Sequence, residues 1–318
     1  MIMNDDCVFL GIDTSNYTTS AALYNSRTKT ALSEKKLLPV KQGQLGLRQS
    51  DAVFHHVRQL PQVLESLFAQ TTDIPCAVGF SARPRDEEGS YMPCFLSGEC
   101  AAKAVASSAH IAAHDFSHQA GHIAAALYSV SRLDLIDKRF LAFHVSGGTT
   151  ECLLVTPDSN IIFGVERIGC SLDLKAGQVI DRVGGMLGLP FPAGRELDAL
   201  SRESSKSYSI TPVIKGMDCC LSGVENQCKR MIVNGDAPCD VARYCIDYIL
   251  AALACMTELA INAHGAMPLL YAGGVMSNTI IRDTFTQRFG GMFASPALSS
   301  DNAVGAAVLA CIRHTGKV

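Results

Sequence analysis

Apolar and polar positions alternate along the chain in a way that predicts short buried strands and longer helices in a fixed order. The first half is expected to form three antiparallel strands, a helix, a strand and a helix, over residues 7–13, 18–24, 30–38, 51–70, 75–80 and 98–110. Within the first of these helices, the 3.6-residue spacing places Val53, Val57, Leu60, Leu64 and Leu67 on one face, which is expected to be buried.

The second half repeats the order. Three further strands are expected over residues 139–145, 151–156 and 160–166, followed by helices, a buried strand over 268–271, a helix from about Asn278 and a closing helix over 301–312. Residues 170–240 do not fit the repeat, because several Gly and Pro breaks separate short helical runs there. We interpret this segment as a helical insertion in the second half.

Two β-β-β-α-β-α halves predict an α/β protein with the duplicated two-lobe fold shared by actin, hexokinase and Hsp70 (ASKHA), with a nucleotide cleft between the lobes. The first lobe is expected to comprise residues 1–138 plus the C-terminal helix 301–318. The second is expected to comprise residues 139–300, including the insertion at about 170–240. The alternative is an α/β protein of another topology.

Composition narrows the class of protein. Hydrophobic residues make up 48% of the 318 residues and charged residues 18%, so a large core is expected and general disorder is excluded. The formal net charge of −3 argues against a basic domain that coats nucleic acid. The longest apolar helix, expected over 248–263, is interrupted by Thr257, Glu258 and Asn262, so no membrane span is expected. The thirteen scattered Cys and the acidic N-terminus predict a reduced, cytoplasmic protein.

Three glycine-containing or hydroxyl-rich turns follow predicted strands. Residues 11–15 (GIDTS) and 146–150 (SGGTT) occupy equivalent places in the two halves, and each could bring backbone N–H groups and hydroxyls to a phosphate. Asp13 in the first turn could also hold a metal-bound water. Residues 272–278 (AGGVMSN) end a strand and open a helix, where Gly273 and Gly274 would leave room for an adenine or ribose. In each case the alternative is a plain tight turn.

Two histidines have the spacing of a metal site. His118 and His122 lie four residues apart, on one face of a predicted helix, which suits two ligands of one metal ion. Gln119 stands where a metalloprotease would carry a general-base Glu, so that hydrolytic mechanism is disfavoured. Asp301, before the closing helix, could supply a carboxylate ligand. The alternatives are two solvated or core histidines and an ordinary N-cap.

Together these segments resemble the TsaD-like family, formerly described as O-sialoglycoprotein endopeptidases, from residue 11 to residue 310 and in the family's order. GIDTS at 11–15 is similar to the family's GIETS, HVR at 56–58 to SRDHV, HQAGH at 118–122 to HxxxH, and VSGG at 145–148 to VSGG. AGQVIDR at 176–182 is similar to AGEAFDK, FPAG at 191–194 to YPGGP, LSG at 221–223 to FSGLK, AGGVMSN at 272–278 to AGGVSAN, and SDN at 300–302 to CTDN.

The resemblance implies an ASKHA-fold transferase that moves a threonylcarbamoyl group from its adenylate to N6 of a tRNA adenosine. It implies ATP, AMP or an adenylate as the bound nucleotide, and a divalent transition metal, iron or zinc, held by His118, His122 and Asp301, with His144 as a candidate fourth ligand. The nucleotide contacts that it implies are Ser146, Gly147, Gly148, Thr149, Asp181, Gly194, Gly273, Gly274 and Asn278. A tRNA substrate follows, with either family-type partner proteins or a homodimer as the assembly.

The chain departs from the family pattern at three places. Tyr17 and Thr18 replace an acidic pair, Thr149 replaces a His, and the Gly-rich AGPG loop reads ARPR at 82–85. Asp13 and Thr18 are the only catalytic candidates on that side. Arg83 and Arg85 either draw an anionic ligand or are solvated surface residues.

The sequence therefore favours a metal-dependent, adenine-nucleotide-binding acyltransferase similar to tRNA N6-adenosine threonylcarbamoyltransferase. The departures keep a second interpretation open: a catalytically weak or altered-acceptor paralogue that acts as a nucleotide-binding partner subunit. The interpretation as a protease rests only on the former description of the family.

Overall fold

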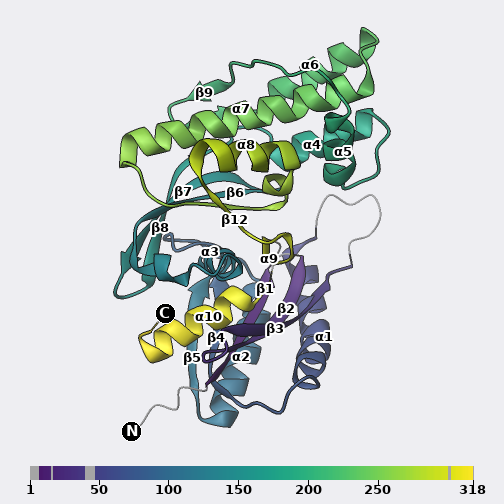
Figure 1. The fold of residues 1–318 in the computed structure, drawn as a ribbon. Helices are drawn as coiled ribbons and strands as arrows, with labels where there is room; N and C mark the ends of the chain where they lie inside the picture. Colours follow the sequence, from purple (N-terminus) through teal and green to yellow (C-terminus); the bar gives the residue numbers. More distant parts are fainter. Residues whose placement is uncertain (1–6, 16, 40–46, 300–301, 318) are drawn as a thin grey trace. The chain divides into compact units, whose positions relative to one another are not determined.

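The computed structural model describes residues 7–15, 17–39, 47–299 and 302–317. The chain forms two compact units. The first comprises Met1–Asp137, Pro157–Gly164 and Ala297–Val318, and the second comprises Lys138–Thr156 and Val165–Pro296. Each unit carries one five-stranded sheet (Figure 1).

The two sheets have the same strand order when the second is read from its opposite edge, as β8-β7-β6-β11-β12. The first is β3-β2-β1-β4-β5, made of β1 (Val8–Ser15), β2 (Thr18–Asn25), β3 (Thr30–Leu37), β4 (Pro75–Arg83) and β5 (Ala112–Ser117). The second is β12-β11-β6-β7-β8, made of β6 (Phe140–Val145), β7 (Thr150–Asp158), β8 (Ile162–Cys170), β11 (Leu269–Ala272) and β12 (Met292–Phe293). In both, the central strand pairs antiparallel with the next strand in sequence and parallel with a strand that follows a helix. The predicted duplicated α/β layout is confirmed.

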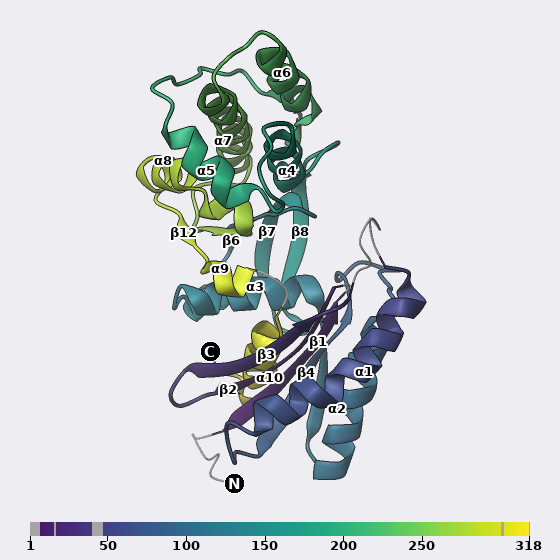
Figure 2. The same ribbon diagram turned by 90° about the vertical axis from the view of Figure 1, so that its right-hand side faces the viewer.

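Helices cover both faces of the first sheet (Figure 2). The helices of this unit are α1 (Gln49–Phe68), α2 (Phe95–Ala109), α3 (His118–Ser129) and α10 (Val304–Thr315), with a 3-10 turn at Leu133–Asp137. Leu10 and Ile12 of β1 pack into one apolar cluster with α1 and α2, whereas Gly11 between them faces α10 on the opposite side. This alternation follows from the two-residue period of a strand.

The buried face of α1 differs from the predicted one. Val57 is 57% exposed, whereas His56 and Gln59 are buried. The hydroxyl of Thr19 on β2 lies 2.8 Å from His56 Nδ1 and donates to Gln59 Oε1 at 2.8 Å. Burial lowers the pKa of His56 to about 4, so the ring is neutral at pH 7. Hydrophobic spacing could not reveal this face, because it is partly made of polar residues that bond to a buried strand hydroxyl.

The fit of α10 depends on residues without large side chains. A Cβ on Gly11 would lie 2.2 Å from the carbonyl O of Ala303, and a Cβ on Gly79 would lie 2.2 Å from that of Ala306. On the other side of α10, a Cβ on Gly305 would lie 1.8 Å from the carbonyl O of Gly121 in α3. Backbone therefore packs directly on backbone, with β1 and β4 on one side of the helix and α3 on the other.

The start of α10 lies later than expected. The sequence places the closing helix from Asp301, whereas the helix begins at Val304, where Asn302 Oδ1 accepts from the Val304 N–H at 3.0 Å. Asp301 itself lies outside the described residues. The hydrophobic pattern does not predict β5 or the start of α3, because half of the residues in β5 are polar and only its last two are buried.

Helices of the second unit gather around one long helix, α7 (Figure 1). They are α4 (Ala176–Met186), α5 (Gly194–Arg202), α6 (Ser222–Val233), α7 (Pro238–His264) and α8 (Thr279–Phe289), with a 3-10 turn at Gly274–Ser277. The short α9 (Pro296–Ser299) begins at the last residue of this unit, and its other residues belong to the first unit. The expected helical insertion also contains a hairpin of three-residue strands, β9 (Val213–Lys215) and β10 (Asp218–Cys220). Strands this short leave too little periodicity to be recognised.

By length and composition alone, α7 could cross a membrane, but a buried core helix meets the same test, so the expectation from residues 248–263 is not overturned. Its most apolar stretch has a mean hydropathy of 1.6, and 61% of that stretch is buried within the protein. Among the described residues it is the one helix that meets this test. Its side chains belong to the apolar cluster of the second unit, as those of a core helix do.

Two single-methyl substitutions test the backbone packing. Gly305→Ala should lower the free energy of unfolding by about 3 kcal/mol, because the methyl group meets the Gly121 carbonyl at an impossible distance. Gly121→Ala is its matched control, because that Cβ would lie 3.9 Å from Ala306 N, at an ordinary contact distance. It should be neutral or stabilising by up to about 1 kcal/mol. Urea denaturation followed by circular dichroism measures both, and equal stabilities of the two variants would contradict the packing.

Candidate functional site

The second unit contains a pocket of about 450 Å³, a size typical of small-molecule sites. Its lining comes from the turn after β6, from α4, from the start of α5 and from the turn after β11. The lining residues are Ser146, Gly147, Gly177, Ile180, Asp181, Pro192, Gly194, Arg195, Asp198, Gly274, Val275, Ser277, Asn278 and Pro296. Six of the predicted nucleotide contacts are among them. Gly148, Thr149 and Gly273 are not in this lining.

The turn between β6 and β7 is closed by its own serine. Ser146 Oγ accepts from the N–H groups of Gly148 (3.3 Å) and Thr149 (3.1 Å). Gly177, in the first turn of α4, donates from its N–H to the Ser146 carbonyl at 3.1 Å. A Cβ on Gly177 would lie 2.6 Å from Gly147 N, so only glycine lets α4 start this close to the turn.

The two glycines after β11 have different roles. Gly273 has φ +100°, and a Cβ there would lie 2.2 Å from the carbonyl O of Val145, so it permits close backbone packing. Gly274 lines the pocket, and a Cβ there would have no atom within 4 Å. Of the pair, Gly274 is therefore the residue that leaves space for a ligand.

Asn278 lines the pocket and carries a buried hydrogen-bond donor. Its Oδ1 accepts from the N–H of Ile281 at 3.1 Å and so caps α8. The cap fixes the orientation of the amide, and its Nδ2, in a residue only 7% exposed, has no hydrogen-bond acceptor among the described residues. Because buried polar atoms are rarely left without partners, this nitrogen indicates a ligand acceptor.

Two carboxylates of the lining are held by backbone groups. Asp181 Oδ1 accepts from the Ala193 N–H at 2.8 Å, which ties α4 to the start of α5. Asp198, which the sequence analysis missed, accepts from the N–H (3.2 Å) and hydroxyl (2.8 Å) of Thr279 and ties α5 to α8. Arg195, also missed, is the one cationic residue of this lining. Asp198 lies one helical turn after Gly194, a predicted nucleotide contact. This spacing could have indicated that Asp198 lies on the same face of α5.

The first unit brings the histidine pair together with Asp13. Within α3, His118 Nε2 and His122 Nε2 lie 2.9 Å apart. Asp13, on β1 and 1% exposed, lies with its Oδ1 3.0 Å from His118 Nδ1. A carboxylate on one ring nitrogen of a histidine orients the other nitrogen, as is usual for histidines that bind metals. The sequence proposed Asp13 for another role and gave no sign of this contact, which joins residues 105 apart.

The other predicted metal ligands are not joined to this pair by the structure. Asp301 lies outside the described residues, and His144 belongs to β6 of the second unit. Among the described residues, no group of three or more His, Cys, Asp or Glu side chains is arranged as a metal site. The two imidazole nitrogens and the carboxylate behind them fit part of a metal site.

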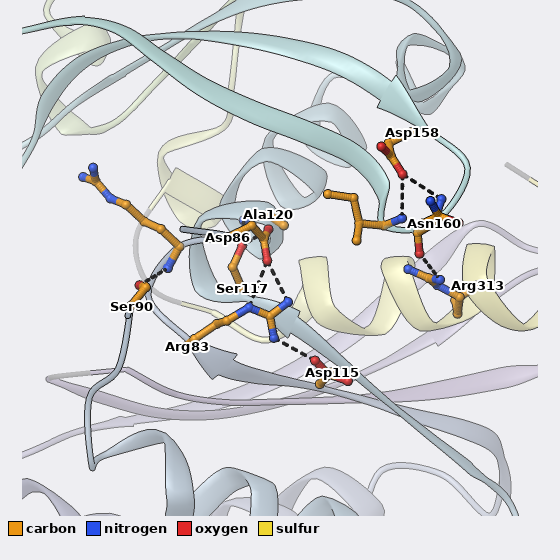
Figure 3. Close-up of polar contacts among 11 residues, drawn as sticks. Arg83, Asp86, Ser90, Asp115, Ser117, Ala120, Asp158, Asn160 and Arg313 are labelled. Carbon is orange, nitrogen blue, oxygen red and sulfur yellow. Dashed lines mark hydrogen bonds and ion pairs between the residues drawn. The ribbon is translucent and has the colours of Figure 1, made fainter. Parts of the chain in front are cut away.

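Arg83 is bound by two carboxylates (Figure 3). Its Nε and Nη2 bind Asp86 Oδ1 at 3.0 and 2.7 Å, and its Nη1 binds Asp115 Oδ2 at 2.7 Å. The hydrogen bond from Arg83 holds the pKa of Asp115 below its usual value. The sequence left two interpretations of Arg83, a residue that attracts an anionic ligand or a solvated surface residue. The first is not supported, because two carboxylates already balance the charge of Arg83. Arg85 lies 3.9 Å from Glu87 Oε1.

The remaining departures flank β1. Tyr17 is 38% exposed, whereas Thr18, the first residue of β2, is buried. Thr18 pairs with Ser15 across the β1–β2 ladder. No carboxylate other than Asp13 lies among the described residues of this turn.

Comparison with protein families identifies a match over residues 28–308 to TsaD, described as tRNA N6-adenosine threonylcarbamoyltransferase. A Bacillus licheniformis protein of that name is 28% identical over 298 residues, which cover 89% of this chain and 83% of the relative. The probable bifunctional tRNA threonylcarbamoyladenosine biosynthesis protein of Thermoplasma acidophilum is 26% identical over 283 residues. The match covers 88% of this chain but only 50% of that relative, so the chain spans about half of its length.

Solved structures agree on the fold. Component A of the Acidaminococcus fermentans (R)-2-hydroxyglutaryl-CoA dehydratase superposes with a TM-score of 0.57 at 13% identity, covering 98% of this chain and 100% of that one. The ROK hexokinase of Thermus thermophilus gives 0.56 at 12% identity, again over 98% and 100%. At these identities the likeness concerns the fold alone, and it confirms the predicted hexokinase-like class.

A valine at position 274 tests which ligand the pocket takes. Gly274→Val should fold normally, because its Cβ has no neighbour within 4 Å, and it should abolish the binding of AMP, the ligand expected from the sequence. Gly223→Val on α6 is the matched control, because its Cβ also meets no atom and the residue is not part of the lining. Isothermal titration calorimetry decides, and unchanged AMP affinity in Gly274→Val would place the nucleotide elsewhere.

Proposed function

The chain belongs to the TsaD family, and from this premise we propose that it binds an adenylate in the pocket of its second unit and transfers the threonylcarbamoyl group. The observation that carries the proposal is Asn278, a lining residue whose buried Nδ2 has no acceptor among the described residues. Ring nitrogens of adenine are acceptors of the kind that this amide lacks. Because Oδ1 already accepts the α8 cap bond, we assign the ligand contact of Asn278 to donation from Nδ2.

The other lining groups suit the rest of an adenylate. Asp181 has one oxygen bound to the Ala193 N–H, and we assign ribose hydroxyls to the other. Ser146 Oγ accepts two N–H groups and keeps its own proton, which can be donated to a phosphate oxygen. Gly147 supplies a backbone N–H beside it. Gly148 and Thr149, whose amides are taken by Ser146, would shape the turn.

The histidine pair would hold the metal. His118 and His122 supply two nitrogens, Asp13 orients the first, and Asp301 and His144 remain the further ligands expected from the sequence. A bound iron or zinc would act as a Lewis acid and as a template for the threonylcarbamoyl group. Asp13, first a catalytic candidate, is thereby assigned to orienting His118.

The transfer itself forms one bond and breaks another. The N6 nitrogen of the tRNA adenosine bonds to the carbamoyl carbon, the bond from that carbon to the phosphate oxygen breaks, one N6 proton is lost and AMP leaves. The protein's part is to fix the adenylate by Asn278, Asp181 and the 146–147 turn, so that the carbamoyl carbon has one position. Preorganised donors at the phosphate stabilise the charge that develops on the leaving group.

A second function is favoured by Tyr17 and Thr18. With no acidic pair in this turn, the chain would bind the nucleotide but use another acceptor, or serve as a nucleotide-binding partner subunit. This alternative keeps the pocket and the histidine pair, and it differs in what accepts the acyl group or in whether the chain transfers one at all.

Asn278→Asp separates the cap of α8 from the ligand contact. Aspartate caps helices as well as asparagine does, so the melting temperature should stay within about 2 °C. The donor becomes an anionic acceptor, and AMP affinity should fall about tenfold or more. Asn278→Ser removes the amide donor without adding charge, keeps a capping side chain whose hydroxyl ends one bond short of the amide nitrogen, and should show most of the loss. Wild-type affinity in both variants would refute the assignment of Asn278.

Metal content tests the histidine pair. After incubation with Zn²⁺ or Fe²⁺ and desalting, the wild type should retain about one metal ion per chain. The His118→Ala/His122→Ala variant should retain almost none. His55→Ala/His264→Ala removes two histidines that are not predicted metal ligands and should behave as the wild type. Inductively coupled plasma mass spectrometry measures all three, and equal metal in the two double variants would end the proposal.

A further inference from the structure

A chain of hydrogen bonds runs from the loop after β4 to the first turn of α3 (Figure 3). Arg83 holds Asp86 through Nε and Nη2, and Asp86 Oδ2 accepts from the Ser117 hydroxyl at 2.6 Å. Ser117 Oγ in turn accepts from the Ala120 N–H at 3.1 Å and caps α3. We call Arg83, Asp86 and Ser117 the α3 ladder.

The ladder leaves Ser117 a single arrangement. Its only proton is donated to Asp86, so its oxygen is oriented to accept from Ala120. The charge on Asp86 strengthens that cap, and a carboxylate near a helix N-terminus is favourable in itself. The same loop also holds the helix by its backbone, because Gln119 N–H donates to the Pro84 carbonyl at 3.0 Å.

His118 follows Ser117 directly and is the first residue of α3. Its ring must meet two partners from different elements, Asp13 Oδ1 on β1 and His122 Nε2 one turn along the helix. A change in where or how α3 begins would move the ring relative to both. The ladder fixes this start through side chains, beside the Gln119–Pro84 backbone bond and the pairing of Arg83 with Ser117 between β4 and β5.

We propose that Asp86 and Ser117 are positioning residues that, held by Arg83, set the orientation of His118 for metal binding. This inference rests on the metal site of the proposed function. It also gives Arg83 a role that neither sequence interpretation offered, as the anchor of the ladder. Asp115, the second partner of Arg83, lies on the side of the guanidinium away from Ser117 and has a side chain 60% exposed, against 15% for Asp86.

The variants follow from this geometry. Asp86→Asn removes the charge of the middle member and leaves the Ser117 cap in place. Asp115→Asn is the matched control, because it makes the same chemical change on the same arginine outside the ladder. Ser117→Ala removes both bonds of the serine, and Ser117→Thr keeps the hydroxyl and should restore the wild-type behaviour.

Two readouts are taken on the whole chain. Co²⁺ titration followed by absorption should show a dissociation constant raised about tenfold in Asp86→Asn and at least as much in Ser117→Ala. Asp115→Asn and Ser117→Thr should stay within about twofold of the wild type, since they leave the ladder intact. In the metal-free protein, long-range ¹H–¹⁵N spectra should show His118 with its proton on Nδ1 in the wild type and a mixture of tautomers in Asp86→Asn.

Each outcome decides one claim. If Asp86→Asn matches Asp115→Asn in both readouts, the ladder does not position His118 and the inference is overturned. If the wild type binds no Co²⁺ but Asp86→Asn alone disturbs the His118 tautomer, the ladder stands and the metal site of the proposed function falls. Because Asp86→Asn keeps the helix cap, the test does not depend on whether Ser117→Ala folds.

Discussion

The first unit depends on how closely α10 approaches its neighbours. Backbone meets backbone at Gly11 and Gly79 on one side of the helix and at Gly121 on the other, and a methyl group at Gly11, Gly79 or Gly305 would meet a carbonyl oxygen. Gly11 lies two residues before Asp13, and Gly121 lies between His118 and His122. The carboxylate and the two imidazoles are thus attached to segments that pack on the same helix. The geometry of the histidine pair therefore depends on the glycines that let β1 and α3 pack closely on α10.

The second unit builds its pocket by a different principle. Ser146, Asp181 and Asn278 each have one polar atom bound to a backbone N–H, and this bond fixes the orientation of the side chain. In the proposed function, the Ser146 hydroxyl proton, the second Asp181 oxygen and the Asn278 amide nitrogen would then meet the ligand. Groups held in this way lose little conformational freedom when a ligand binds, which is why preorganised sites favour affinity and specificity. The hydrogen bonds that link these helices use the same kind of side chain: Asp181 links α4 to α5, and Asp198 links α5 to α8.

The fold could be predicted from the sequence because the strand and helix periods are strong and occur twice. The turns at 146–148 and 272–278 were also recognisable, since Gly and hydroxyl residues follow apolar strands. What could not be predicted were contacts between residues far apart in the chain. Asp13 reaches His118 across 105 positions and Arg83 reaches Asp115 across 32, and nothing in the local pattern of either member signals its partner. The polar face of α1 was missed for a related reason, because His56 is buried by a bond to Thr19 and not by hydrophobicity.

Acyl transfer to a tRNA adenosine is the central claim, and one measurement tests it most directly. Unmodified tRNA is incubated with threonylcarbamoyl adenylate and the purified protein, alone and with family-type partner proteins, and its nucleosides are analysed by mass spectrometry. The account predicts that adenosine carrying the threonylcarbamoyl group on N6 accumulates with the wild type and not without it. A protein that binds AMP in the pocket but leaves the tRNA unmodified under every condition would contradict the account and favour a different acceptor.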